Sequence, residues 1–127
     1  MKKLIAAIAL TCAPAQAYAQ VPENRQDLPL WLGKTYNDLN STIDEGTKAE
    51  IKAYACPRVM DLAQTTTSLL AEMFSKRAEI DKAIKSGATH ADLKSKWESY
   101  TATQDLTHHA TLIDFALTAA CGMALKE

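Results

Sequence analysis

The stretch AIKSGATHADL, residues 83–93, ends one helical pattern and begins another. Gly87 suits the end of a helix, because glycine adopts the left-handed conformation that closes the last turn without steric cost. Thr89 precedes Asp92 by three residues. A threonine in that position can cap the start of a helix, because its hydroxyl can accept the backbone N–H three residues later. The sequence therefore predicts a turn at residues 86–90 between two helices.

Apolar residues recur three, four or seven positions apart on both sides of this turn. Before it stand Val59, Leu62, Leu69, Leu70, Met73, Ile80 and Ile84, and after it stand Leu93, Trp97, Tyr100, Leu106, Ala110, Ile113, Leu117, Ala120 and Ala124. This spacing is typical of helices that bury one face. We expect a long antiparallel helical hairpin with arms at about 57–86 and 90–125.

One or two shorter helices are predicted to precede the hairpin and pack on it. The first runs from Pro29 to about Ile43, although Gly33 weakens it by up to about 1 kcal/mol relative to alanine. Thr47 and Glu50 form a capping box that starts another helix at Lys48. That helix meets Pro57, where it either kinks or ends before a new helix. With no strand alternation, hairpin-turn dipeptide or repeat in the sequence, the predicted fold class is all-α.

The hairpin register predicts a disulfide between Cys56 and Cys121. Residues that face each other across an antiparallel hairpin have numbers with a nearly constant sum, equal to twice the position of the turn. The two cysteines give 177, whose half, 88.5, falls inside the predicted turn. The same sum pairs Ile84 with Leu93, Ile80 with Trp97, and Leu62 with Phe115.

Residues 1–19 have the pattern of a secretory signal peptide. Lys2 and Lys3 precede a short apolar run that ends at Leu10, and a small-residue cleavage site closes at Ala19. The run is too short to span a bilayer, so we expect no transmembrane segment after cleavage. A lipid anchor at Cys12 is disfavoured, because threonine is a poor residue before a lipidated cysteine. The expected location is the Gram-negative periplasm, or the medium after full secretion.

Cleavage leaves two cysteines in a compartment where disulfides persist, which supports the predicted bond. Residues 20–27 are polar and are expected to form a flexible leader, followed by a single all-helical domain at 28–127. Without Lys2 and Lys3 the chain carries 12 basic and 15 acidic residues, a formal charge of −3. Since no strong basic field remains, we expect no nucleic-acid partner.

Histidines in the second arm raise the question of a metal site. Asp105 and His109 are four residues apart, a helical spacing that can direct two ligands at one ion, and His108 lies beside them. The register places Thr65 to Ser68 opposite instead of further ligands. The alternative interpretation is that one histidine faces solvent and the other joins these hydroxyls in a polar layer, which either fixes packing or awaits a partner. No metal or other cofactor is therefore predicted.

Three aromatic residues, Trp31, Tyr36 and Tyr54, either form a partner-binding face or cover one side of the hairpin. The sequence contains no nucleophile–base arrangement, glycine-rich phosphate loop or haem motif, so we do not expect an enzyme. The predicted function is a small exported interaction protein of the immunity, inhibitor, secretion-accessory or conjugation-accessory type. Its expected partner is another exported protein, or a second copy in a homodimer.

Two other functions stay open at this point. One is a metal or small-molecule carrier that uses His108 and His109. The other is an acid-stress chaperone, because a short exported helical chain with one disulfide is similar in layout to the HdeA-type chaperones. The resemblance implies client binding at low pH. The long stretch before Cys56 departs from that family, in which the first cysteine comes early.

Overall fold

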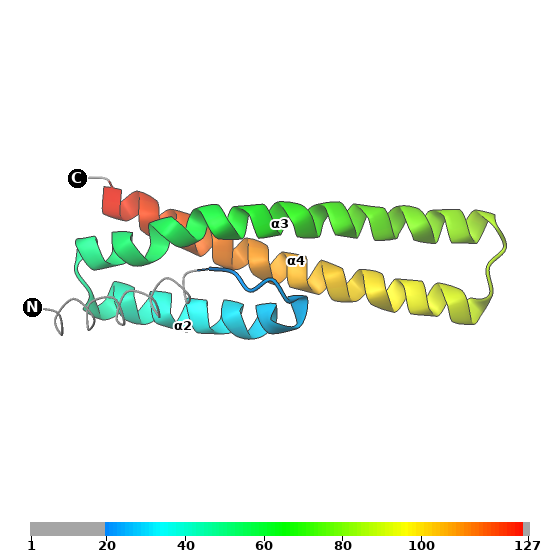
Figure 1. Cartoon of the computed structure of the whole chain (residues 1–127), viewed down its shortest axis with the longest axis horizontal. Coiled ribbons are helices and arrows are strands. Elements are labelled where there is room, and N and C mark those ends of the chain that lie inside the picture. Colours follow the sequence, from blue (N-terminus) through cyan, green and yellow to red (C-terminus); the bar gives the residue numbers. More distant parts are fainter. Residues whose placement is uncertain (1–19, 126–127) are drawn as a thin grey trace, which may run out of the picture.

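Three α-helices account for most of the residues that the structure describes. In this computed structural model, residues 20–125 comprise a short 3-10 turn, η1 (Arg25–Asp27), and helices α2 (Leu28–Glu45), α3 (Lys48–Lys85) and α4 (His90–Leu125). No strand occurs within that range. The all-α prediction is confirmed, and Figure 1 shows α3 and α4 as the two long antiparallel arms. The expected signal peptide and Cys12 lie outside the described residues.

The turn between the arms forms as the sequence predicts. Gly87 has a positive φ of 74°, and its N–H donates to the carbonyl of Ile84 at 3.2 Å. The next N–H, of Ala88, donates to the carbonyl of Ala83 at 3.0 Å, which completes a Schellman motif. The hydroxyl oxygen of Thr89 then accepts the N–H of Asp92 at 3.2 Å and caps α4.

Helix α3 begins earlier than the predicted first arm. Thr47 and Glu50 form the expected capping box, and the helix then continues from Lys48 through Pro57 instead of restarting there. Proline removes the hydrogen bond to the carbonyl of Ala53. Both residues are exposed, so water can satisfy that carbonyl. Of the two alternatives at Pro57, the continuous helix is the one observed, and Figure 1 shows α3 changing direction in its N-terminal third.

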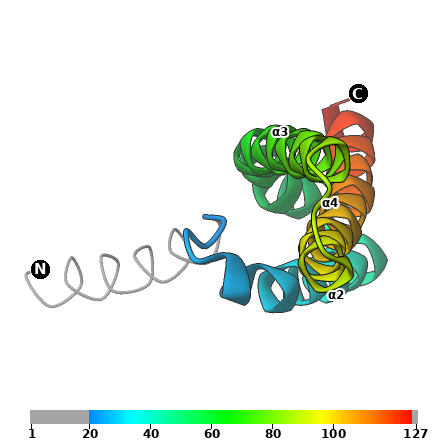
Figure 2. The same cartoon turned by 90° about the vertical axis from the view of Figure 1, so that its right-hand side faces the viewer.

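The core lies where α2 packs against the base of the hairpin, the end away from the turn. Helix α2 contributes Leu28, Leu32 and Leu39 to it, each at most 1% exposed. Their partners on the hairpin are Ala55, Leu62, Leu69, Ala110, Ile113, Leu117 and Ala120. Each buried leucine contributes on the order of 2 kcal/mol. Figure 2, which views the molecule along its length, shows α2, α3 and α4 around this core.

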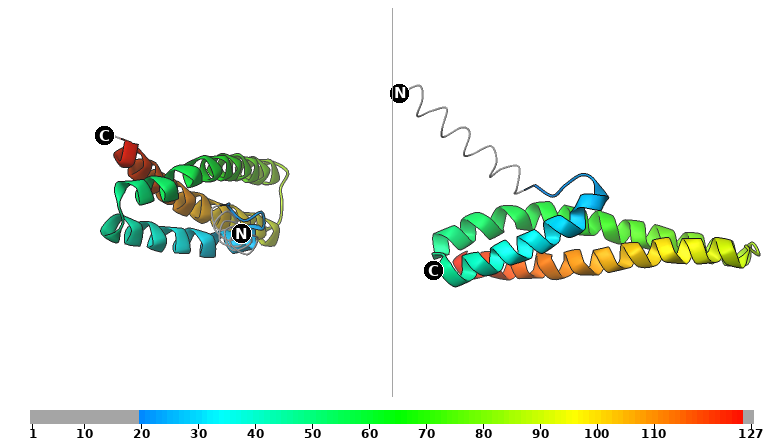
Figure 3. Two further views of the ribbon diagram at one scale, coloured as in Figure 1. Left: turned by 60° about the vertical axis from the view of Figure 1, so that its left-hand side comes forward. Right: turned by 90° about the horizontal axis from the view of Figure 1, so that it is seen from below.

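Helix α2 covers only about half of the hairpin. Arg25, just before α2, pairs with Glu72 near the middle of α3 and also donates to the Ser68 hydroxyl at 3.3 Å. From there to the turn, α3 and α4 continue as two helices alone, as the right-hand view of Figure 3 shows. We call this part, residues 76–98, the turn end of the hairpin.

Residues 20–27 have more defined structure than the sequence suggested. We expected a flexible leader, but Val21 packs against the core and Arg25 forms the contacts with α3 described above. Asn24 also caps η1, since its side-chain oxygen accepts the Gln26 N–H at 3.0 Å. An apolar anchor and an ion pair thus hold a segment whose composition alone looked unstructured.

The disulfide joins Cys56 of α3 to Cys121 of α4 at the base of the hairpin, with 2.07 Å between the sulfurs and 4.9 Å between the Cα atoms. The register is therefore correct at this end. One predicted apolar pair is shifted, within the slip of one turn that such a register allows: Leu62 is fully buried, but Phe115 is 66% exposed. Helices drift relative to a straight seam, so Ile113 and Leu117 fill the core positions of α4 instead.

Candidate functional site

Three threonines are buried inside the hairpin, and only Thr66 of them belongs to the predicted polar layer. Thr66 of α3 and Thr103 and Thr107 of α4 are buried in the hairpin. Each hydroxyl donates to the carbonyl four residues earlier, at 2.6 Å for Thr66 and Thr107 and at 3.2 Å for Thr103. Lys76 adds a hydrogen bond to the Thr103 hydroxyl at 2.8 Å. Because these hydroxyls are satisfied within the chain, the three threonines favour a role in packing.

Neither of the predicted histidines is buried beside these threonines. His108 and His109 are both exposed on α4, as is Asp105, so the expectation that one histidine lines the seam is wrong. The threonines of α4 occupy the inward positions, and the histidines fall on the outer face of the helix. Within residues 20–125, no group of three or more His, Cys, Asp or Glu side chains is placed to hold a metal ion.

The three predicted aromatic residues do not share one exposed face. Trp31 and Tyr54 are half-buried against the core, and only Tyr36 is exposed. The Tyr54 hydroxyl donates to the carbonyl of Thr35 at 3.3 Å, and the Arg58 guanidinium lies 3.7 Å from the centre of its ring. Burial raises the pKa of the Tyr54 hydroxyl. This tyrosine therefore joins α2 to α3.

Asp114 is a partly buried acid whose Oδ1 is buried and has no hydrogen-bond partner in the described part of the chain. It lies on α4 between Ile113, which is in the core, and the exposed Phe115. Burial raises the pKa of its carboxyl, because removal from water disfavours the charged form. A carboxylate oxygen that is buried without a hydrogen bond has a cost in stability.

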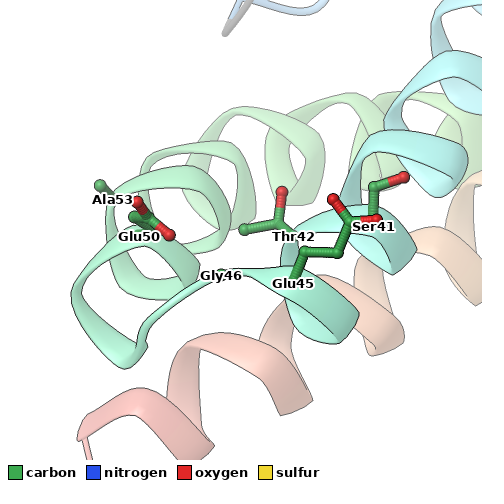
Figure 4. A pocket seen from close by; sticks show the side chains of 6 residues that line it. All are labelled: Ser41, Thr42, Glu45, Gly46, Glu50 and Ala53. Atoms are coloured by element: carbon green, nitrogen blue, oxygen red, sulfur yellow. The ribbon is translucent and has the colours of Figure 1, made fainter.

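A hollow of about 520 Å³ lies where α2 meets α3. Figure 4 shows Ser41 and Glu45 of α2 on one side and Glu50 and Ala53 of α3 on the other, with Gly46 in the connection. The Glu50 carboxylate already accepts the Thr47 N–H at 2.8 Å in the capping box. The residues of this hollow therefore explain how the connection folds, and they supply no catalytic arrangement.

An apolar groove of about 390 Å³ lies at the turn end of the hairpin, and we call it the turn groove. Its apolar lining comes from both arms, and its rim carries charged and polar side chains. The lining is Ile80, Ile84, Leu93 and Trp97, and the rim is Arg77, Asp81, His90 and Lys94. The two register pairs Ile80–Trp97 and Ile84–Leu93 thus come together as predicted, but they line a surface groove instead of a closed core.

Neighbouring contacts orient the sides of the turn groove. The Trp97 ring lies 5.5 Å from that of the buried Tyr100, measured between centroids. Arg77 extends over the Tyr100 ring at 6.0 Å and pairs with Asp81, with 3.7 Å between Nε and Oδ1. Ile84 remains 59% exposed and Trp97 49% exposed. Trp97 is therefore held against Tyr100 on one side, and both Ile84 and Trp97 present open surface to a partner.

Charge is distributed unevenly along the molecule. The turn end, residues 76–98, holds six Lys or Arg and four Asp or Glu residues, a net charge of +2. The remaining described residues hold five basic and ten acidic side chains, a net charge of −5. The turn groove is therefore in the positive part of an otherwise acidic protein. This groove was not predicted from the sequence, although the predicted first helix is much shorter than either arm of the hairpin.

Searches with protein-family models, curated protein sequences and solved structures found no match to this chain. Across residues 20–125, no helix is both long and apolar enough to cross a membrane.

Proposed function

We propose that this chain is a non-enzymatic, exported interaction protein that binds another exported protein through the turn end of its hairpin. The proposal of export rests on the signal-peptide pattern of residues 1–19, and the disulfide between Cys56 and Cys121 suits an oxidising compartment such as the periplasm. The proposal that it is not an enzyme rests on the sequence, which lacks a nucleophile–base motif.

The observation that carries the proposal is the turn groove. It collects four apolar side chains from two helices in the part of the hairpin that α2 does not cover. Scattered apolar residues are normal on a protein surface, but an apolar groove with a polar rim is typical of a binding site. An antiparallel helix pair is also a rigid support, which lowers the conformational cost of binding.

Site-specific crosslinking in the periplasm tests this proposal. A photo-reactive amino acid replaces Lys94 at the groove rim or, as a control, the exposed Asp44 at the far end of α2. We expect a specific crosslink to an exported protein from position 94 and none from position 44. Absence of any crosslinked protein, or equal crosslinking from both positions, would contradict the proposal. Recovery of a mature chain that begins at Gln20 tests the proposed export.

Two matched variants distinguish binding in the turn groove from non-specific binding to exposed apolar residues. Ile84→Ser alters the groove, and Leu112→Ser alters an apolar residue of α4 outside it. The two side chains are similarly exposed, at 59% and 52%, so both variants should fold. We expect the first to weaken the crosslink from position 94 and the second to leave it unchanged.

An acid-stress chaperone is the second candidate, favoured by the ion pair of Arg25 and Glu72. This pair holds the segment that packs Val21 onto the core. Protonation of Glu72 would release it and expose apolar surface, which is the behaviour expected of a chaperone that binds clients in acid. Failure to prevent client aggregation at pH 2–3 would eliminate this candidate.

A further inference from the structure

We infer that the occupant of the turn groove is an amphipathic helix of a partner protein, with apolar residues on one face and acidic residues beside them. The inference rests on the proposed function and specifies the chemistry of the partner. It draws on three observations: the shape of the groove, the way that this hairpin already binds a helix of its own, and the charge around the groove.

The shape of the groove suits a helix. Ile80 and Ile84 on α3 are four residues apart, as are Leu93 and Trp97 on α4, so each arm presents two side chains one turn apart. A trough between two antiparallel helices accepts the ridge of apolar residues on a third helix. The lining extends over eight residues of each arm, on the order of 10 Å, which corresponds to about two turns of a docked helix.

The base of the hairpin shows how this helix pair binds a third helix. There, α2 inserts Leu28, Leu32 and Leu39 against α3 and α4, and these positions recur at helical intervals. At the turn end no helix of residues 20–125 occupies the corresponding place (Figure 3). A partner helix in the turn groove would therefore repeat, in trans, a packing arrangement that the chain uses within itself.

The charge of the turn end selects an acidic helix. Arg77 and Lys94 lie on opposite sides of the groove, and the only acidic side chain that lines it, Asp81, is already paired with Arg77. Lys94 also approaches Glu98 at 3.9 Å, an exposed contact that a partner carboxylate can replace. The net charge of +2 on the turn end attracts an acidic ligand, and the −5 of the remaining described residues repels it.

Two synthetic peptides test the inference on the mature, oxidised protein. Both are 16-residue helical peptides with the same leucines on one face, and the residues flanking that face are glutamates in one and lysines in the other. Fluorescence anisotropy of labelled peptides gives the two dissociation constants. We expect the glutamate peptide to bind at least about tenfold more tightly at low salt, with a preference that shrinks as salt increases.

Variants of the protein assign the binding to the groove. Arg77→Glu with Lys94→Glu should reverse the preference between the peptides. Ile84→Ser should lower the affinity of the protein for the glutamate peptide at least about tenfold, whereas the control Leu112→Ser should not change it. Circular dichroism and the thermal midpoint of each variant establish that the hairpin is intact.

Other occupants give different results. Equal affinity for the two peptides, or preference for the lysine peptide, overturns the acidic-helix inference. If sedimentation shows a dimer that Ile84→Ser dissociates, the occupant is a second copy, and the inference is wrong. Failure of both peptides to bind would also overturn it, while the crosslink from position 94 could still identify an exported partner. The two proposals can therefore fail separately.

Discussion

Cys56 and Cys121 are separated by 65 positions in the sequence, yet their Cα atoms lie 4.9 Å apart. The bond joins α3, one residue before Pro57, to the last turns of α4. It closes the base of the hairpin, and the Schellman turn at Gly87 closes the opposite end. The two arms are thus fixed at both ends, which keeps the sides of the turn groove in register.

Loss of the disulfide should destabilise the protein severely. Cys56→Ser with Cys121→Ser removes a crosslink that, in the chain-entropy model, contributes about 4 kcal/mol for a loop of this length. Urea unfolding of the variant and of the oxidised and reduced wild type measures the loss. The mass of the native mature protein should be two hydrogens below its sequence mass. Two free thiols in the native protein would refute the bond.

Two glycines, one extended at the end of α2 and one inside that helix, should respond to alanine in opposite directions. A Cβ at Gly46, in the connection between α2 and α3, would lie 2.5 Å from the Thr42 carbonyl oxygen and 2.9 Å from Glu50 Oε2. Gly46→Ala should therefore cost about 1–3 kcal/mol. At Gly33, within α2, a Cβ meets nothing within 4 Å. Gly33→Ala should stabilise the protein by about 0.5–1 kcal/mol.

Thermal or urea unfolding of the two variants checks this pair of predictions, with the wild type measured beside them. The opposite signs are the diagnostic result, because a general effect of reduced chain entropy would stabilise both variants. A stabilised Gly46→Ala protein would show that the connection adjusts at little cost.

The contribution of Asp114 to stability should be more favourable in mild acid than at neutral pH. Its pKa in the folded state is raised by burial from the ordinary 3.8. The folded state therefore holds the proton more tightly than the unfolded state, and this contribution declines as the pH rises from about 3.8 through the raised value. Asp114→Asn should remove that decline and increase stability at pH 7, on the order of 1 kcal/mol.

Urea midpoints of wild type and Asp114→Asn between pH 3 and pH 8 provide the measurement. The gap between the two curves should widen as the pH rises through the raised pKa and then stay constant. A gap that is the same at every pH would mean that the carboxyl is solvated in the folded state.

Much of the fold could be predicted because its signals are local. The Gly87 turn, the Thr47 and Thr89 caps and the helical apolar spacing depend on neighbouring residues, and all are observed. The cysteine pairing followed from the register of the hairpin. Continuation of α3 through Pro57 could not be predicted, because it depends on whether the unpaired carbonyl faces water, and this is a property of the tertiary structure.

The turn groove was harder to predict than the fold. Ile84 and Trp97 have the spacing of core residues, and their exposure follows from which part of the hairpin α2 covers. At 1.5 Å per residue, the 18 residues of α2 span about 27 Å and the 38 residues of α3 about 57 Å. These lengths show that half of the hairpin must lack a third helix. Which half remains uncovered depends on long-range contacts such as Arg25 with Glu72.

The Arg25–Glu72 pair should give a pH dependence opposite to that of Asp114. Partial burial opposes ionisation of Glu72, but the hydrogen bond from Lys76 and the charges of Arg25 and Lys76 outweigh it and lower the pKa from 4.5. The stabilising contribution is therefore complete above about pH 4.5 and is lost as the pH falls through the lowered value. Because the pair is partly exposed, Glu72→Gln should cost at most about 1 kcal/mol at pH 7, and little at pH 3.

Hydrogen exchange at residues 21–28 checks this prediction. Exchange should be faster in Glu72→Gln than in the wild type at neutral pH, and the wild type should reach the faster rate only in acid. Unchanged protection of this segment in the variant would show that Val21 and Leu28 hold it without the ion pair.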